Sequence, residues 1–281
     1  YRLDDGDWQP EEEILRLDTR CRKLLGWAPV NGGSAQPWCT PPEPSRHRLS
    51  LRFRIRSQLS LSGVSLALER LEETEIRFNG ATVPSVATGF YTDHDIRTVA
   101  LPELTAGENL LELTFPFNKR ETAEWCYLLG DFGVRVCGRE KTVIPRAPML
   151  GFGSITEQSL PFYGGRLTYC IPFTAPRDGT LTVHIPQFRA ALLECAVDNG
   201  APQPIAFAPY TASLHVTAGA HTLYLSAYLN RTNTFGALHN TDRKETWIGP
   251  ALWRTEGDRW CYEYELSEEG ILHTPVVTLL V

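Results

Sequence analysis

The stretch that decides the fold reads IRFNG at residues 76–80 and LTAGENLLEL at residues 104–113. The same order returns as VDNG at residues 197–200 and LHVTAGAHTLYL at residues 214–225. Each copy runs from an Asn-Gly turn through an aromatic residue and a strand to a Thr-Ala-Gly turn and a second strand. The Asn-Gly pairs lie 120 residues apart and the Thr-Ala-Gly turns lie 112 apart. This repetition predicts two copies of one β-module.

Apolar and polar residues alternate through most of the chain. The clearest runs are 51–55, 111–115, 132–136, 181–185 and 223–227. Such alternation is typical of antiparallel strands that bury one face and expose the other. Turn signals rich in Gly, Pro, Asn and Asp separate the runs. The predicted fold class is all-β, with two tandem antiparallel β-sandwich (jelly-roll) domains.

The 281 residues are enough for two domains. Gly138, the charged residues 139–141 and the prolines Pro145 and Pro148 mark the boundary. We therefore expect domain 1–142, a β-sandwich with an N-terminal extension, and domain 143–281, a second β-sandwich. In the extension, residues 14–24 carry apolar side chains at a helical period after three glutamates. An amphipathic helix and a strand entering the first sandwich are equal alternatives there.

Charge and hydropathy narrow the range of partners. With 27 Lys and Arg against 33 Asp and Glu, the net charge is −6, which argues against a surface that follows nucleic-acid phosphates. No apolar run approaches the ~20 residues of a membrane helix. Arg52, Arg54 and Arg56 alternate with apolar residues, so we interpret them as the solvated face of a strand. A bound anionic glycan or acidic partner is the alternative.

The seven cysteines form no CxxC pair and no short Cys/His cluster, so no zinc site is predicted. Their odd number and scattered spacing favour reduced, mostly buried thiols over a disulfide framework. Cys126 and Cys137 are the two that could pair across neighbouring strands. Unpaired thiols favour the cytoplasm, but the sequence does not assign a compartment.

Catalytic signatures are missing from the sequence. It contains no GxSxG, HExxH, P-loop or GxGxxG motif. A glycosidase needs two carboxylates about 5–10 Å apart on either side of one bond. The candidates for such a pair are Asp93, Asp131, Asp242 and Glu256, although nothing in the sequence marks any two of them as partners.

Aromatic residues give a stronger indication of function. Trp247 and Trp253 lie beside Gly and Pro in a predicted loop, and Trp38 lies in another Pro-rich loop. An indole face can stack on the C–H face of a sugar, while polar neighbours bond its hydroxyl groups. Those polar neighbours are Arg231, His239, Asn240 and Asp242. The alternative is packing, and we expect Trp260, Tyr262 and Tyr264 to fill one face of a strand.

Two segments resemble the sugar-binding jelly-roll domain of glycoside hydrolase family 2. In that domain a strand with Asn-Gly precedes a Trp/Tyr-x-Asp segment, and a Gly-x-Asn turn precedes an apolar strand. This sequence has Tyr91-Thr92-Asp93 and Gly107-Glu108-Asn109. Residues 127–134, 160–165, 233–240 and 247–271 are similar to the C-terminal region of large bacterial glycosidases that carry that domain. The second copy departs from the pattern, with Gly219-Ala220-His221 in place of Gly-x-Asn.

The resemblance implies an accessory region of a multidomain bacterial glycoside hydrolase, whose catalytic acid and nucleophile belong to a separate barrel domain. The leading expectation is non-catalytic carbohydrate binding. A structural scaffold that packs against the catalytic domain, and a glycosidase with an unrecognised carboxylate pair, are the alternatives. The expected partners are a glycan and the catalytic domain of the same polypeptide, with no nucleic acid and no membrane. A structural calcium ion needs about 6–8 oxygen ligands and no acidic loop marks them, so no cofactor is predicted.

Overall fold

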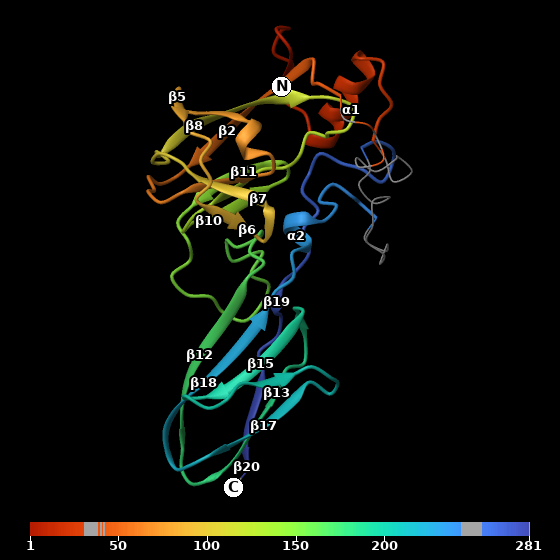
Figure 1. The fold of residues 1–281 in the computed structure, drawn as a ribbon. Coiled ribbons are helices and arrows are strands. Elements are labelled where there is room, and N and C mark those ends of the chain that lie inside the picture. The colour runs from red at the N-terminus through yellow and green to blue at the C-terminus, as the bar shows by residue number, and fades with distance from the viewer. Residues whose placement is uncertain (31–38, 40, 42, 243–254, 281) are drawn as a thin grey trace. The chain divides into compact units, whose positions relative to one another are not determined.

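The computed structural model describes residues 1–30, 39, 41, 43–242 and 255–280 (Figure 1). Contacts between Cα atoms divide the chain into two compact units. The first unit comprises residues 1–146 and 239–264, and the second comprises residues 147–238 and 265–281. The predicted boundary at residue 142 lies inside β11 (Glu140–Ile144), a strand of the first unit. Residues 239–264 are grouped with the first unit although they follow most of the second in sequence.

The first unit contains two sheets, antiparallel except that β11 runs parallel to β2. The larger sheet has the order β10-β11-β2-β8-β4-β5, with β1 paired to β2. Its strands are β1 (Arg2–Leu3), β2 (His47–Ser57), β4 (Glu75–Phe78), β5 (Ala81–Val83), β8 (Gly107–Phe117), β10 (Gly133–Cys137) and β11. The smaller sheet has the order β6-β7-β3-β9, formed by β6 (Gly89–Tyr91), β7 (Asp93–Ala100), β3 (Ser65–Leu68) and β9 (Tyr127–Leu129). A short 3₁₀ turn, η2 (Leu71–Glu73), precedes β4.

The core of the first unit lies between these sheets. Leu49 and Leu111 come from the larger sheet and Leu66 and Val99 from the smaller one, and all four belong to one buried cluster. The long strand β8 alternates as the sequence predicted, because it buries every second side chain against the opposite layer.

The ambiguous N-terminal segment is a helix, α1 (Ile14–Leu24). The Glu13 carboxylate accepts hydrogen bonds from the backbone N–H groups of Leu15 and Arg16 at 2.9 and 3.1 Å, which caps the first turn. The helix buries Ile14, Leu17 and Cys21 in the same core, whereas Leu24 at its end is exposed. Of the two alternatives, the amphipathic helix is therefore correct.

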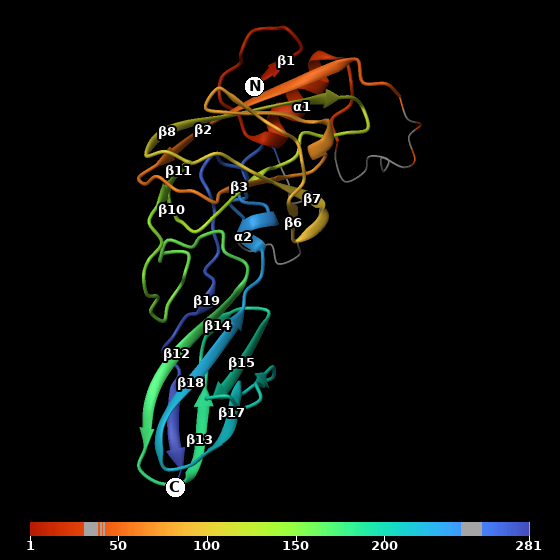
Figure 2. The ribbon, with the colours of Figure 1, turned by 60° about the vertical axis from the view of Figure 1, so that its left-hand side comes forward.

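The second unit is also a sandwich (Figure 2). One sheet has the order β12-β18-β15-β16, from β12 (Arg166–Ala175), β18 (Gly219–Tyr228), β15 (Leu192–Val197) and β16 (Gln203–Ile205). The other has the order β17-β13-β20, from β17 (Thr211–Val216), β13 (Gly179–His184) and β20 (Val276–Leu280). β14 (Phe188–Arg189) pairs with β19 (Gly270–Ile271), and a short helix α2 (Thr232–Phe235) follows β18. Buried residues of both sheets, including Leu181 and Leu225, form one core.

The two sandwiches share one topology. The order β2-β8-β4-β5 in the first corresponds to β12-β18-β15-β16 in the second, and β7-β3-β9 corresponds to β17-β13-β20. The register agrees as well, because Phe78 pairs with Leu111 as Val197 pairs with Leu223. The prediction of an all-β fold with two antiparallel sandwiches, built on one repeated module, is confirmed.

In both copies, side-chain hydrogen bonds join the same two turns, and we call this arrangement the polar clasp. In the first copy, Asn79 has a positive φ of 48°. Its Oδ1 accepts a hydrogen bond from Leu110 N at 2.8 Å, and its Nδ2 donates one to Asn109 Oδ1 at 2.9 Å. In the second copy, Asp198 has a positive φ of 50°. Its Oδ1 accepts a hydrogen bond from Thr222 N at 2.8 Å, and its Oδ2 lies 2.7 Å from His221 Nδ1. Asn and Asp are the side chains that best tolerate this left-handed conformation.

The seven cysteines are free thiols, so Cys126 and Cys137 do not form a disulfide. Cys21 and Cys195 are buried, whereas Cys39, Cys137 and Cys170 are exposed. The expectation of mostly buried thiols is therefore wrong.

Candidate functional site

The residues predicted to contact a ligand fall in different places. Trp38, Trp247 and Trp253 lie outside the described residues. His239 and Asn240 belong to the first unit, whereas Arg231, which precedes α2, belongs to the second. Arg231 therefore does not share a unit with His239 and Asn240.

His239 lies in an aromatic cluster. Its ring centroid is 5.9 Å from that of Trp260 and 4.9 Å from that of Tyr264, and Trp260 packs edge-on against Tyr262 at 4.6 Å. An isolated β-bridge joins Asn240 to Trp260, but residues 261–264 form no strand. The expected strand with Trp260, Tyr262 and Tyr264 on one face is therefore wrong.

Cations cover the rings of this cluster. The Arg16 guanidinium lies 4.4 Å from the Trp260 ring centroid, and Lys141 Nζ lies 4.1 Å from that of Tyr264 and 2.6 Å from its hydroxyl. Burial lowers the pKa of His239, whose Nδ1 lies 3.1 Å from the Glu263 carbonyl oxygen. These contacts hold residues 255–264 against α1 and β11, which is a packing role for the rings.

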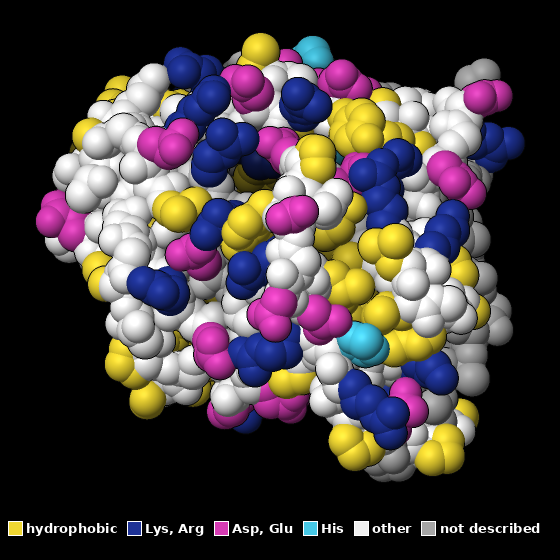
Figure 3. Space-filling view, turned by 90° about the horizontal axis from the view of Figure 1, so that it is seen from above, with side chains coloured by type: hydrophobic (Ala, Val, Ile, Leu, Met, Phe, Trp, Pro, Cys, Tyr) yellow, Lys and Arg dark blue, Asp and Glu magenta, His cyan; other side chains and the backbone are white. Residues whose placement is uncertain are grey.

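The outer face of the larger sheet in the first unit is built from ion pairs. Cross-strand contacts join Arg48 to Glu75 at 2.6 Å and Arg52 to Glu112 at 2.7 Å, and Arg56 reaches Glu140 at 3.0 Å. Figure 3 shows a surface on which basic and acidic side chains are interleaved. The arginines are thus the solvated face of a strand, as the sequence predicted.

The corresponding face of the second unit has a different composition. By register, Cys170 and Tyr224 occupy the places of Arg52 and Glu112, and Tyr228 occupies the place of Pro116. Tyr224 and Tyr228 are partly exposed, because they alternate on β18 with Leu223, Leu225 and Ala227, which are buried in the core. We call the face formed by Arg166, Thr168, Cys170, Glu194, Tyr224, Ser226 and Tyr228 the tyrosine face.

Hydrogen bonds hold the tyrosine face in place. The Tyr228 hydroxyl donates to Glu194 Oε2 at 2.8 Å, and the hydroxyls of Thr168 and Ser226 lie 2.8 Å apart. At a rise of about 3.4 Å per residue, the four steps from Tyr224 to Tyr228 separate their Cα atoms by roughly 14 Å. Two partly exposed aromatic rings, with a carboxylate and hydroxyl groups between them, can stack on apolar faces of a ligand and bond its polar groups. The sequence signal for this face was the alternation on β18, since placing Leu223 and Leu225 inward places Tyr224 outward.

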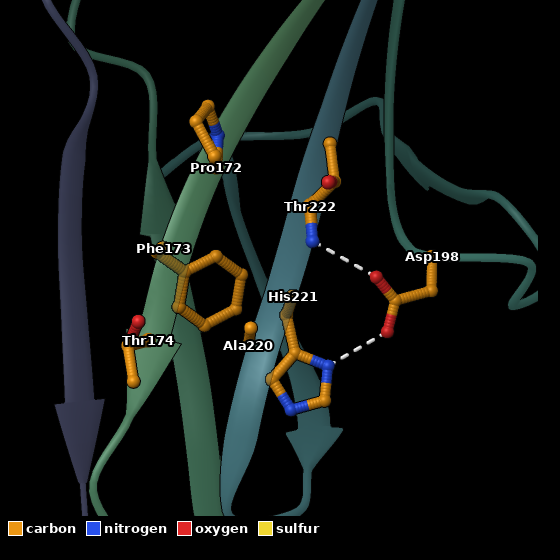
Figure 4. Close-up of a pocket in the computed structure, with 7 residues that line it drawn as sticks. All are labelled: Pro172, Phe173, Thr174, Asp198, Ala220, His221 and Thr222. Atoms are coloured by element: carbon orange, nitrogen blue, oxygen red, sulfur yellow. Dashed lines mark hydrogen bonds and ion pairs between the residues drawn. The ribbon is translucent and has the colours of Figure 1, made fainter.

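A hollow of about 390 Å³ lies over the ends of β12 and β18 (Figure 4). It is lined by Pro172, Phe173, Thr174, Asp198, Ala220, His221 and Thr222. His221 Nε2 lies 2.9 Å from the Thr217 carbonyl oxygen, so both ring nitrogens face acceptors. The hydrogen bond to Asp198 raises the pKa of His221, and the same bond lowers the pKa of Asp198. The pair therefore favours the protonated ring of His221 and the ionised carboxylate of Asp198.

The carboxylates considered for catalysis have other partners or neighbours. Asp131 pairs with Arg146 at 2.7 Å and Asp242 with Arg259 at 3.5 Å. The Asp93 carboxylate accepts a hydrogen bond from Asp95 N at 2.9 Å, which closes a turn. Glu256 is exposed.

Within the described ranges, no three His, Cys, Asp or Glu side chains are grouped so that they could hold a metal ion. No helix in that part of the chain is long and apolar enough to cross a membrane.

Neither a family model nor a curated protein matches this sequence. Among solved structures, similarity extends to a rhamnosidase from Novosphingobium sp. PP1Y, with 13% identity and a TM-score of 0.31 over 92% of this chain and 26% of that one. An anti-sigma factor domain-containing protein matches at 7% identity and TM-score 0.22, over 68% of this chain and 78% of that one. Another, from Clostridium clariflavum, matches at 12% identity and TM-score 0.18, over 66% and 75%. The chain thus spans about a quarter of the rhamnosidase it resembles, and the likeness to glycoside hydrolase family 2 stays an expectation.

Proposed function

We propose that this chain is a non-catalytic, carbohydrate-binding accessory region of a multidomain bacterial glycoside hydrolase. The observation that carries the proposal is the tyrosine face of the second unit. Its rings take the positions that ion-paired or proline side chains hold on the same face of the first unit. Partly exposed aromatic rings beside fixed hydroxyl and carboxylate groups suit the alternating apolar and polar faces of a sugar.

The charges on the tyrosine face suit a neutral ligand. The Arg and Glu side chains of the tyrosine face, Arg166 and Glu194, have opposite charges and both lie beside Tyr228. A face of this kind has no excess charge to attract a polyanion. The catalytic domain of the same polypeptide is the second proposed partner, because the chain supplies a binding face and no marked catalytic pair.

The test is retention of the purified chain on a broad glycan array and in polysaccharide-containing gels. We expect Tyr224→Ala and Tyr228→Ala to weaken retention by roughly tenfold or more, the effect of one lost stacking contact. Phe207→Ala is the matched control, because Phe207 is an aromatic residue of the same unit that is 86% exposed and lies outside the tyrosine face.

Other outcomes identify the alternatives. If retention is lost in Trp247→Ala or Trp253→Ala while both tyrosine variants bind normally, the site is the one expected from the tryptophans. A blank array from a folded, monodisperse chain would support the scaffold alternative, in which the sandwiches pack against a catalytic domain without binding sugar.

A further inference from the structure

The tyrosine face is one end of a longer surface. Every second side chain of β12 and β18 points away from the core, which gives five outward positions on each strand. These positions form five cross-strand pairs, namely Arg166–Tyr228, Thr168–Ser226, Cys170–Tyr224, Pro172–Thr222 and Thr174–Ala220. The eight steps from Ala220 to Tyr228 span about 27 Å at a rise of about 3.4 Å per residue. We call this surface the long face of the second unit, and its Thr174–Ala220 end the far end.

The long face is almost free of charge over its whole length. In the first unit, the ten equivalent positions on β2 and β8 hold six charged side chains, which are Arg48, Arg52, Arg54, Arg56, Glu108 and Glu112. In the second unit, the only charged side chain among the ten positions is Arg166, at one end. Because the two units share topology and register, this loss of charge belongs to the second copy and extends well beyond the two tyrosines.

Hydroxyl groups are common where the charges are missing. The ten positions of the long face hold four Ser or Thr and two Tyr side chains, and none holds Val, Leu, Ile, Met or Phe. The core of a protein–protein interface, by contrast, is rich in apolar side chains and poor in serine. A hydroxyl-rich surface with separate aromatic rings suits a ligand whose own surface alternates between hydroxyl groups and C–H faces.

The possible contacts follow one line along β18. Tyr224 is partly exposed, and its cross-strand neighbours are Cys170 on β12 and Ala196 on β15, which are too small to cover a phenol ring. Beyond Tyr224, the outward side chains of Thr174 and Thr222 border a shallow hollow at the far end (Figure 4). The line from Tyr228 through Tyr224 to these threonines is several times longer than a single sugar ring.

We propose that the long face binds a linear, uncharged glycan chain that lies along β18 and spans several sugar units. This inference rests on the proposed function and deepens it, because it specifies the shape and charge of the ligand. Sugar faces of the chain stack on Tyr224 and Tyr228, and hydroxyl groups further along the chain bond to Thr174 and Thr222. A monosaccharide or disaccharide reaches only part of this line.

The test measures how affinity depends on the length of the glycan. The probes are linear oligosaccharides, from the disaccharide to the hexasaccharide, of β-1,4-linked glucose, mannose and xylose and of α-1,4-linked glucose. Each series is titrated into the native chain and its variants, and amide resonances are followed by NMR, which also shows whether each variant is folded.

Two variants block the far end and leave the tyrosines in place. Thr174→Arg combined with Ala220→Glu recreates the cross-strand pair Arg56–Glu108 of the first unit, at two exposed positions. Pro172→Arg recreates Arg54 at another exposed position and is the second, independent variant. Ser213→Arg is the control, because it adds an exposed arginine to β17 in the opposite sheet.

We expect at least one series to gain roughly tenfold or more in affinity from the disaccharide to the hexasaccharide. Both far-end variants should lose this gain and still bind the disaccharide as the native chain does, whereas Ser213→Arg should bind every length normally. Equal affinity for the disaccharide and the hexasaccharide would overturn the inference, as would normal hexasaccharide binding by both folded far-end variants. If length has no effect but polysaccharide retention still depends on Tyr224 and Tyr228, the proposed function stands; if no oligosaccharide binds and retention also fails, both are wrong.

Discussion

Glu269 provides the sharpest quantitative prediction. It is 3% exposed, and neither carboxylate oxygen has a hydrogen-bond partner among the described residues. Burial raises the pKa of this carboxyl from 4.5 to about 7, although the Asn230 side chain and Arg189 offset part of the effect. Because the folded-state pKa is the higher one, the neutral acid favours folding below pH 4.5, and this stability is lost as pH rises through 7. The difference between the two values corresponds to about 3 kcal/mol.

Glu269→Gln keeps the shape of the side chain and removes its titration. We expect the variant to match the native chain in stability near pH 4 and to exceed it by about 3 kcal/mol at pH 8. The second unit contains no tryptophan, so the assay is hydrogen exchange of the buried strands β13, β15 and β18 across that pH range. The measured free energy of opening gives the comparison directly.

Glu268→Gln is the matched control, because this neighbouring glutamate is exposed. It should change stability by less than about 0.5 kcal/mol at every pH. The reasoning is refuted if the Glu269→Gln and native curves stay parallel from pH 4 to pH 8. Parallel curves would mean that the carboxyl is solvated or paired in solution.

Three further predictions concern buried or paired polar groups. Asn109 is 1% exposed and makes several hydrogen bonds with Asn79 and Thr105. Asn109→Ala should therefore destabilise the first unit by about 2–4 kcal/mol. Urea unfolding, followed by tryptophan fluorescence, measures this change. The Asp198–His221 pair should stabilise the second unit only at pH values between the lowered pKa of Asp198 and the raised pKa of His221. The double variant Asp198→Asn with His221→Asn should therefore lose less hydrogen-exchange protection than the native chain as the pH rises above neutral. Arg22 pairs with buried Asp18 at 2.7 Å, and Arg22→Ala should cost about 3–5 kcal/mol in the same urea assay by leaving that carboxylate unpaired.

The repeated module could be predicted from sequence because its signals are local. Asn-Gly and Thr-Ala-Gly turns report backbone conformations that few other residues adopt, and alternation reports which side of a strand is buried. The correspondence within the clasp was one residue off. The spacing pairs Asn79 with Asn199, whereas the residue with the same left-handed conformation and the same bonds is Asp198.

The placement of residues 239–242 and 255–264 could not be predicted, because the contacts that fix it connect distant parts of the chain. Arg16 covers Trp260, and Tyr264 N donates to Gly138 O at 3.0 Å. Neither contact leaves a local pattern in the sequence. The tyrosine face could have been predicted from the same alternation that identified the core residues. The predicted site was instead placed in the loops, because those loops contain the tryptophans.

Our proposal assigns the difference between the two sandwich faces to carbohydrate binding, because this difference is expected to contribute little to stability. Exposed ion pairs such as Arg52–Glu112 contribute about 0–1 kcal/mol each, so exchanging them for Cys170 and Tyr224 leaves the fold nearly unaffected. The prediction is that Cys170→Arg with Tyr224→Glu, which restores the arrangement of the first module, changes the free energy of unfolding by less than about 1 kcal/mol while glycan retention falls. Hydrogen exchange of β18 and retention in polysaccharide gels measure the two quantities on the same protein. A large loss of protection with unchanged retention would show that Tyr224 serves packing, and the tyrosine face would then carry no argument for carbohydrate binding.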